Sequence, residues 1–211
     1  MTTDSPAPRR ALIVIDVQNE YLGGGLPIEY PDPQQALAHI VAAMDAAHAA
    51  QIPTVLVQQM APADSPLFAE GSHGWQLHAE VARRPHALLV RKNLPSAFTG
   101  TGLAAWLQKH AIDTLSVAGF MTHNCDASTI FEALHAGLAV EFLHDAAGAL
   151  SYRNQAGAAQ AEEIHRVFCV VLQSRFAAVL ATKDWIAGLQ SGAPPVRDNI
   201  FASNRRARGL L

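Results

Sequence analysis

Short apolar runs alternate along this chain with longer stretches in which apolar residues recur every three or four positions. The runs are apolar at nearly every position, which is typical of strands that helices cover on both faces. The longer stretches have the spacing of helices with one apolar side. The runs are residues 11–15, 54–57, 87–90, 114–118, 139–143 and 167–172, and helical spacing occurs at Leu37, Ile40, Val41, Met44 and His48, at Leu103, Trp106 and Leu107, and at Phe176, Val179 and Leu180.

This alternation predicts an α/β protein with a single Rossmann-like domain. Its three layers would be a six-stranded parallel sheet and the helices that flank it, joined by right-handed crossovers. A chain of 211 residues is long enough for one domain with a sizeable core. We expect the domain to span residues 11–190, after a disordered or extended tail at 1–10 and before a C-terminal extension at 191–211.

Composition narrows the range of partners. Hydrophobic residues make up 50% of the chain and charged residues 16%, which is typical of a compact protein with a buried core. The net charge of −3 provides no basic surface for nucleic acid or an anionic membrane. No apolar stretch approaches the ~20 residues that span a bilayer, and the first ten residues lack the apolar run of a secretory signal. Two cysteines are too few for a disulfide framework, so we predict a cytoplasmic protein that binds a small molecule or another protein chain.

Three side chains that could carry chemistry come at the ends of predicted strands. Asp16 follows the first run, Lys92 the third, and Cys125 the fourth, where a helix is expected to begin. In a parallel sheet these ends share one edge, and crevices form there where the strand order reverses. A thiol at a helix start faces free backbone N–H groups, which favours the reactive thiolate. Taken singly, the three also fit a turn aspartate, a solvated lysine and a thiol packed as a small hydrophobe; together they predict a nucleophilic cysteine with a proton acceptor and a cation.

A long segment without a clear pattern, residues 60–84, follows the second predicted strand. It contains two prolines and two glycines and offers only a short helix, around residues 75–81. Loops of this length at the carboxyl end of a strand often build binding sites. A surface excursion or a contact between two copies of the chain are the alternatives.

Four motifs then give the chain a resemblance to the isochorismatase-like cysteine hydrolases. They are DVQNEY at 16–21, RKNLPSAF at 91–98, GFMTHNC at 119–125 with Thr129, and DAAGA at 145–149. They stand in the family's order and extend from the first predicted strand past the fifth. The superfamily includes nicotinamidases, N-carbamoylsarcosine amidases, and ureidoacrylate, biuret and streptothricin hydrolases.

The resemblance implies a catalytic triad of Asp16, Lys92 and Cys125. It also implies a cis peptide bond between Phe120 and Met121, and an oxyanion site formed by the backbone N–H groups of Met121 and Cys125. In the implied reaction, Asp16 accepts the thiol proton, Lys92 stabilises the thiolate, and Cys125 attacks an amide or ureido carbonyl to give a thioester. Relatives usually assemble, so the resemblance further implies a homodimer or homotetramer.

One departure from the family concerns metal ions. Metal-dependent nicotinamidases have an Asp-x-His ligand motif after the second strand, where this chain has Gln58-Gln59-Met60. These side chains offer neither a carboxylate nor an imidazole. His73 and His78 follow in the loop, where two histidines without a carboxylate are more often solvated. We therefore expect no metal ion and no other cofactor, as in the metal-free branch that includes streptothricin hydrolase.

The leading prediction is a cysteine hydrolase that cleaves a C–N bond of a small amide, lactam or ureido compound. An isochorismatase-type vinyl-ether hydrolase is one alternative, and a catalytically silent module that binds a small molecule is another. Cys169, inside the sixth apolar run, is expected to be an inert thiol of a core strand. The residues expected to line a substrate pocket are Gln18, Tyr21, Gln59, Trp75, Phe98 and Phe120.

Overall fold

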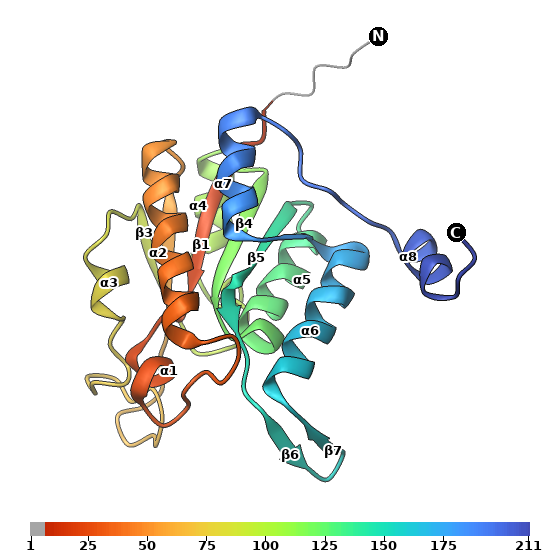
Figure 1. Ribbon diagram of the computed structural model, residues 1–211. Helices are drawn as coiled ribbons and strands as arrows, with labels where there is room; N and C mark the ends of the chain where they lie inside the picture. Colours follow the sequence, from red (N-terminus) through yellow and green to blue (C-terminus); the bar gives the residue numbers. More distant parts are fainter. Residues whose placement is uncertain (1–6) are drawn as a thin grey trace.

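Six parallel strands form the central sheet of the computed structural model, which describes residues 7–211 (Figure 1). Their order across the sheet is β3-β2-β1-β4-β5-β8, so the chain runs outward in one direction from β1 and in the other from β4. The predicted α/β architecture is therefore confirmed. The strands are β1 (Arg10–Ile15), β2 (Thr54–Gln59), β3 (Leu88–Lys92), β4 (Thr114–Phe120), β5 (Ala139–Gly148) and β8 (Ala178–Leu180).

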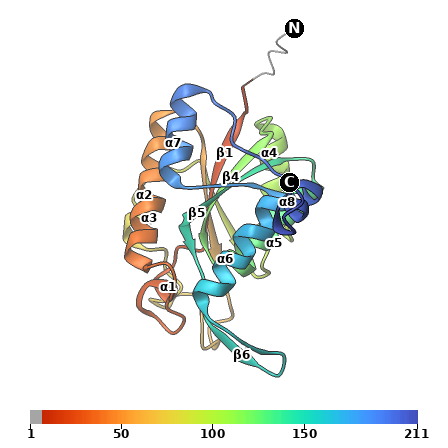
Figure 2. The same ribbon diagram turned by 45° about the vertical axis from the view of Figure 1, so that its right-hand side comes forward.

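Helices cover both faces of the sheet and enclose two hydrophobic cores. On β1, Leu12 and Val14 point into one core, which α2 and α7 complete, while Ile13 and Ile15 point into the other, beneath α4 and α5. This alternation explains why the strand sequence is apolar at every position. Figures 1 and 2 show the resulting three layers. The helices are α2 (Pro33–Ala49), α4 (Leu103–Lys109), α5 (Ala127–His135), α6 (Ala161–Val171) and α7 (Thr182–Ser191).

The sixth strand is not where the sequence predicted it. Residues 167–172 lie in α6 and at the start of the π-helical turn η2 (Leu172–Phe176), and the strand is β8, within the segment that was expected to be helical. Valines dominate the predicted run and favour strands, but Ile164, Phe168 and Val171 recur with helical spacing. Because β8 has only three residues, its own pattern is too short to identify it. Cys169 therefore lies on a helix and is partly buried, not inside a core strand.

The connections contain four smaller elements. The 60–84 segment is irregular apart from α3 (Ala79–Ala82), and α1 (Asn19–Gly23) follows β1. The hairpin of β6 (Tyr152–Asn154) and β7 (Gly157–Ala159) projects beyond the carboxyl end of the sheet (Figure 1). The C-terminal extension carries α8 (Ile200–Ala207). Of the predicted N-terminal tail, residues 1–6 lie outside the described part, and no helix of the described residues is long and apolar enough to cross a membrane.

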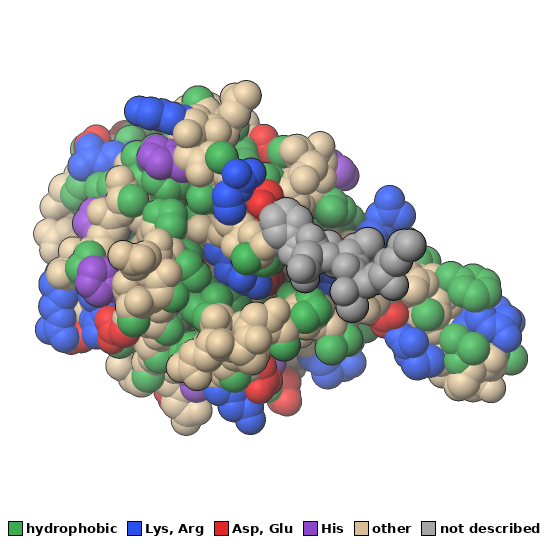
Figure 3. Space-filling model, turned by 90° about the horizontal axis from the view of Figure 1, so that it is seen from above, with side chains coloured by type: hydrophobic (Ala, Val, Ile, Leu, Met, Phe, Trp, Pro, Cys, Tyr) green, Lys and Arg blue, Asp and Glu red, His purple; other side chains and the backbone are tan. Residues whose placement is uncertain are grey.

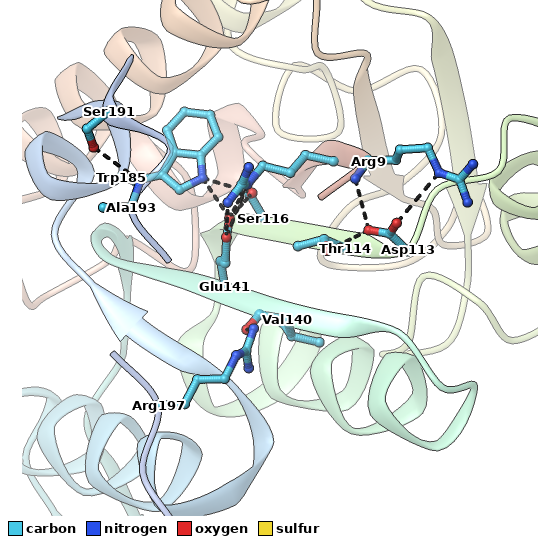
Figure 4. A network of polar contacts seen from close by, with 11 residues as sticks. Arg9, Asp113, Thr114, Ser116, Val140, Glu141, Trp185, Ser191, Ala193 and Arg197 are labelled. Carbon is cyan, nitrogen blue, oxygen red and sulfur yellow. Dashed lines mark hydrogen bonds and ion pairs between the residues drawn. The ribbon is translucent and has the colours of Figure 1, made fainter. Parts of the chain in front are cut away.

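A buried polar network joins the strands at their amino ends (Figure 4). Arg10 of β1 forms a 2.8 Å ion pair with Glu141 of β5. The same carboxylate accepts hydrogen bonds from Ser116 of β4 at 2.7 Å and from the Trp185 indole of α7 at 2.8 Å. A cavity of about 550 Å³ adjoins this network, at the end of the sheet opposite Asp16, Lys92 and Cys125. The network links three strands and a helix across both sides of the point where strand order reverses.

Candidate functional site

Asp16, Lys92 and Cys125 meet at the carboxyl edge of the sheet. Asp16 directly follows β1, Lys92 is the last residue of β3, and Cys125 lies in the π-helical turn η1 (Thr122–Asp126) that follows β4. The chain reverses its direction across the sheet between β1 and β4, and ligand sites of open α/β sheets form beside such a point. The topology therefore brings together residues that are far apart in the sequence.

The Lys92 ammonium group connects the three side chains. Its Nζ atom lies 2.7 Å from Asp16 Oδ2 and donates hydrogen bonds to Cys125 Sγ at 3.2 Å and to Gln59 Oε1 at 2.8 Å. The side chains of Lys92 and Asp16 are both fully buried. A buried ion pair of this kind is retained only when further hydrogen bonds offset its desolvation, and Gln59 supplies one of them.

Burial sets the protonation of the cluster. It raises the pKa of Asp16, and the charge of Lys92 opposes that rise only in part. Burial and the nearby Asp16 carboxylate raise the pKa of Cys125 far above its ordinary value, against the opposing effect of Lys92. Burial lowers the pKa of Lys92, but Asp16 and Cys125 outweigh it, so the net shift is upward. Cys125 is therefore a thiol at rest, although its position at a helix start suggested a thiolate.

The backbone around the cluster is unusual at three positions. The Phe120–Met121 peptide bond is cis, as predicted. Gly119 has a φ of 122°, and a Cβ atom there would collide with the backbone oxygen of Ile15 on the adjacent strand. Asp16 itself has a φ of 50°, in the left-handed region that aspartate and asparagine tolerate better than most residues. Glycine at position 119 thus allows β1 and β4 to approach closely where Asp16 and the turn that carries Cys125 leave the sheet.

A cavity of about 250 Å³ opens beside the thiol. Of the residues predicted for the site, Tyr21, Gln59, Met121 and Cys125 line it. Its wall is apolar apart from the thiol, a phenol and three amides, and it contains no Asp, Glu, Lys, Arg or His. The other lining residues are Leu26, Phe68, Asn93, Leu94, Pro95 and Asn124.

The remaining four predicted pocket residues do not line this cavity. The Gln18 side chain is buried and donates to the backbone oxygens of Gln59 and Trp75 at 3.0 and 2.6 Å. The guanidinium of Arg91 lies over the Trp75 ring, with Arg91 Cζ 5.6 Å from the ring centroid. Phe98 and Phe120 pack into the two cores on opposite faces of the sheet. Gln18 thus holds the 60–84 segment against the end of β2.

A second carboxyl group, which the sequence did not predict for the site, lies next to the thiol in the chain. Asp126 follows Cys125 directly, is fully buried, and neither of its oxygens has a hydrogen-bond partner among the described residues. Burial raises its pKa well above the usual range, and the charge of Asp16 adds to this. His123 and Tyr152 were also missed as a pair; His123 Nε2 and the Tyr152 hydroxyl lie 2.8 Å apart, which links η1 to the projecting hairpin. Only adjacency to Cys125 could have pointed to Asp126.

Residues 58–60, where the sequence predicts no metal ligands, contact other parts of the chain. Gln58 donates a hydrogen bond to the backbone oxygen of Trp75, and Gln59 accepts one from Lys92. Within residues 7–211, no three His, Cys, Asp or Glu side chains are grouped so that they could hold a metal ion.

Comparison with known proteins identifies relatives over most of the chain. The family model for the isochorismatase domain matches residues 10–184. A crystal structure of an isochorismatase-like protein from Burkholderia xenovorans is 65% identical, covers 97% of this chain and 98% of its own, and superposes with a TM-score of 0.95. A streptothricin hydrolase from Streptomyces noursei is 32% identical over 65% of this chain and 49% of its own length. An N-carbamoylsarcosine amidase from Arthrobacter is 27% identical over 61% of this chain and 55% of its own.

Proposed function

The chain belongs to the isochorismatase family of hydrolases, and from that premise we propose that it hydrolyses a C–N bond of a small amide, lactam or ureido compound through a thioester on Cys125. The observation that carries the proposal is the position of Lys92 Nζ, within hydrogen-bonding distance of both the thiol and the Asp16 carboxylate. A nucleophile, a proton acceptor and a cation in contact are what covalent catalysis by a cysteine requires.

In the first half of the proposed reaction, the thiol proton passes to Asp16 as Cys125 Sγ attacks the substrate carbonyl carbon. Because the pKa of the thiol is strongly raised, deprotonation in advance is unfavourable, and proton transfer and attack are expected to be coupled. Lys92 offsets the negative charge as it moves from the carboxylate to sulfur. The C–N bond then breaks, and Asp16 returns the proton to the leaving nitrogen.

The second half releases the acid product. Asp16, again a carboxylate, accepts a proton from a water molecule that attacks the thioester carbonyl carbon. The C–S bond breaks and the proton returns to sulfur, which restores the resting thiol. Raised pKa values on buried acids allow such a group to accept and donate a proton in one cycle at neutral pH.

We place the oxyanion site at the backbone N–H groups of Met121 and Cys125. Both residues line the cavity; Met121 directly precedes the turn η1, and Cys125 lies within it. Preorganised N–H donors stabilise the charge that develops on the carbonyl oxygen, and the loss of one such donor typically costs about 3–4 kcal/mol.

The cavity wall favours an uncharged substrate. No side chain that carries a charge near pH 7 lines it, whereas the side chains of Gln59, Asn93 and Asn124 can donate to a carbonyl and accept from an N–H group. At about 250 Å³ the cavity is smaller than typical sites for drug-sized ligands. The relatives named streptothricin hydrolase and N-carbamoylsarcosine amidase support C–N hydrolysis as the reaction class.

The experiment is a panel of small neutral amides, lactams and carbamoyl compounds, with ammonia or amine release as the readout. Cys125→Ala should abolish release from whichever compound the wild type hydrolyses, while Cys169→Ala, the matched control at the other cysteine, should retain it. Mass spectrometry of the quenched enzyme should detect an acyl adduct on Cys125. Full activity of Cys125→Ala would refute the covalent mechanism, and no turnover anywhere on the panel would refute the reaction class.

A further inference from the structure

The C-terminal arm, defined here as residues 200–211, projects from the body of the protein (Figures 1 and 3). None of the side chains of α8 is buried against the described part of the chain, and the Phe201 ring is 71% exposed. The Burkholderia xenovorans structure covers all but about six residues of this chain, fewer than the arm contains, so that relative shares at least part of it. Large apolar side chains that the arm exposes are Ile200, Phe201, Leu210 and Leu211.

An eight-residue helix cannot depend on its own stability. Isolated helices shorter than about 12–15 residues are marginal in water and gain most of their stability from packing an apolar side. The linker before α8 is fixed to the body by two hydrogen bonds. Gln173 donates one to the Val196 oxygen, and Arg197 donates the other to the Val140 oxygen, as Figure 4 shows for the second. The arm therefore leaves the body in a defined direction, and its apolar side chains are not packed against the described part of the chain. To be stable, α8 has to pack these side chains against a surface of another molecule.

Helix α6 carries a second exposed apolar surface in the same chain. Only Ala161 and His165 of this helix are buried, whereas Val167, Val170 and Val171 are exposed, Val170 by 59%. We call these three valines the α6 strip. Exposed apolar groups that cluster in this way mark interaction sites more often than scattered ones do.

The two surfaces also complement each other in charge. The first turn of α6 has exposed acids at Glu162 and Glu163, and neither forms an ion pair within the described residues. The arm carries Arg205, Arg206 and Arg208, of which Arg206 pairs with Asp198. An arm laid along the α6 strip would bring arginines toward these acids.

We propose that the C-terminal arm docks on the α6 strip of a second copy of this chain, in a reciprocal exchange about a twofold axis. Both views place α8 beside the C-terminal end of α6, so the arm and the helix that carries the strip lie on one side of the molecule (Figures 1 and 2). Two copies facing each other through this side each offer an arm and a strip, and the contact closes as a dimer. A partner of other chemistry would leave unexplained why the strip and the arm match in one chain.

The proposal is tested by sedimentation equilibrium of the full chain. The wild type should be a dimer, and either Phe201→Glu in the arm or Val170→Glu in the strip should shift the equilibrium to monomer by at least a hundredfold in dissociation constant. Leu89→Glu is the matched control, because Leu89 is a 39% exposed apolar residue on the distant edge strand β3 and should leave the dimer intact. Circular dichroism verifies that each variant is folded.

Mixing the two monomeric variants tests the reciprocal geometry. In a heterodimer of the two variants, the wild-type arm of the Val170→Glu chain can dock on the wild-type strip of the Phe201→Glu chain, so one of the two contacts is intact. In a homodimer of either variant, both contacts contain a substitution. The mixture should therefore dimerise more tightly than either variant alone. A monomeric wild type, a dimer unaffected by both substitutions, or no recovery in the mixture would overturn the proposal.

Discussion

Removing the cation from the buried cluster is the sharpest test of its electrostatics. In Lys92→Met, a side chain of similar length loses its charge and all three contacts, those to Asp16, Cys125 and Gln59. The Asp16 carboxylate is then buried without a cation. Breaking a buried pair in this way costs about 3–5 kcal/mol of folding free energy, because the remaining charge is uncompensated.

The loss of folding free energy in Lys92→Met should depend on pH, and the burial of Asp16 determines the direction of this dependence. Burial already raises the pKa of Asp16, and the variant lacks the Lys92 charge that opposes the rise, so the pKa of Asp16 moves further upward. Between the unfolded pKa, near 3.9, and the folded one, the folded state binds more protons. The free energy of unfolding of the variant therefore falls as pH rises, by up to about 1.4 kcal/mol per pH unit. It falls relative to the wild type once the pH exceeds the folded pKa of Asp16 in the wild type. The difference in free energy of unfolding between the wild type and the variant should be smallest near pH 4.

The assay is urea unfolding of the wild type and the variant at several pH values between 4 and 8. The control is the double variant Lys92→Met/Asp16→Asn, which removes both charges and keeps a residue that tolerates the φ of 50° at position 16. It should regain most of the stability at pH 7.5 and remain inactive. A single variant within 1 kcal/mol of the wild type at pH 7.5, or a loss independent of pH, would refute a buried charged pair.

Three further predictions concern the backbone, a histidine and the metal. Gly119→Ala should destabilise the protein by more than about 4 kcal/mol or prevent its folding, because a Cβ there meets the Ile15 oxygen; a normal melting temperature would contradict this. Burial lowers the pKa of His165 to about 4, so the unfolded state takes up its proton first, and stability should decrease by about 3 kcal/mol as pH falls from 6.5 to 4. His165→Gln should have a flatter profile in the same unfolding assay, and an equal slope would exclude this histidine as the cause. Because Gln58 and Met60 occupy the two ligand positions of the Asp-x-His motif with which the sequence was compared, turnover should survive chelation, and its loss would show that a metal takes part.

Local pattern determined most of the architecture. Five of the six apolar runs are strands of the sheet, since continuous burial on both faces leaves an uninterrupted apolar run in the sequence. The same reasoning placed Asp16, Lys92 and Cys125 at strand ends, and parallel strands bring such ends to one edge. Pattern failed at the sixth strand because β8 has three residues, while the valines of α6 resemble a strand and remain exposed on a helix.

The chemistry of the site depended on three-dimensional packing. The sequence placed Cys125 at a helix start and so favoured a thiolate, but only the tertiary structure encloses the thiol together with Asp16, and desolvation then outweighs the helix terminus. The cavity wall likewise draws Leu26, Phe68 and Asn93 from three separate loops, whose paths no local periodicity specifies. The burial of Asp126 likewise results from the packing around η1, which the local sequence does not specify. The sequence alone determined which groups reach the edge of the sheet, because strand periodicity is a local property. Only the tertiary structure decided how far these groups are shielded from water, because burial depends on the whole chain.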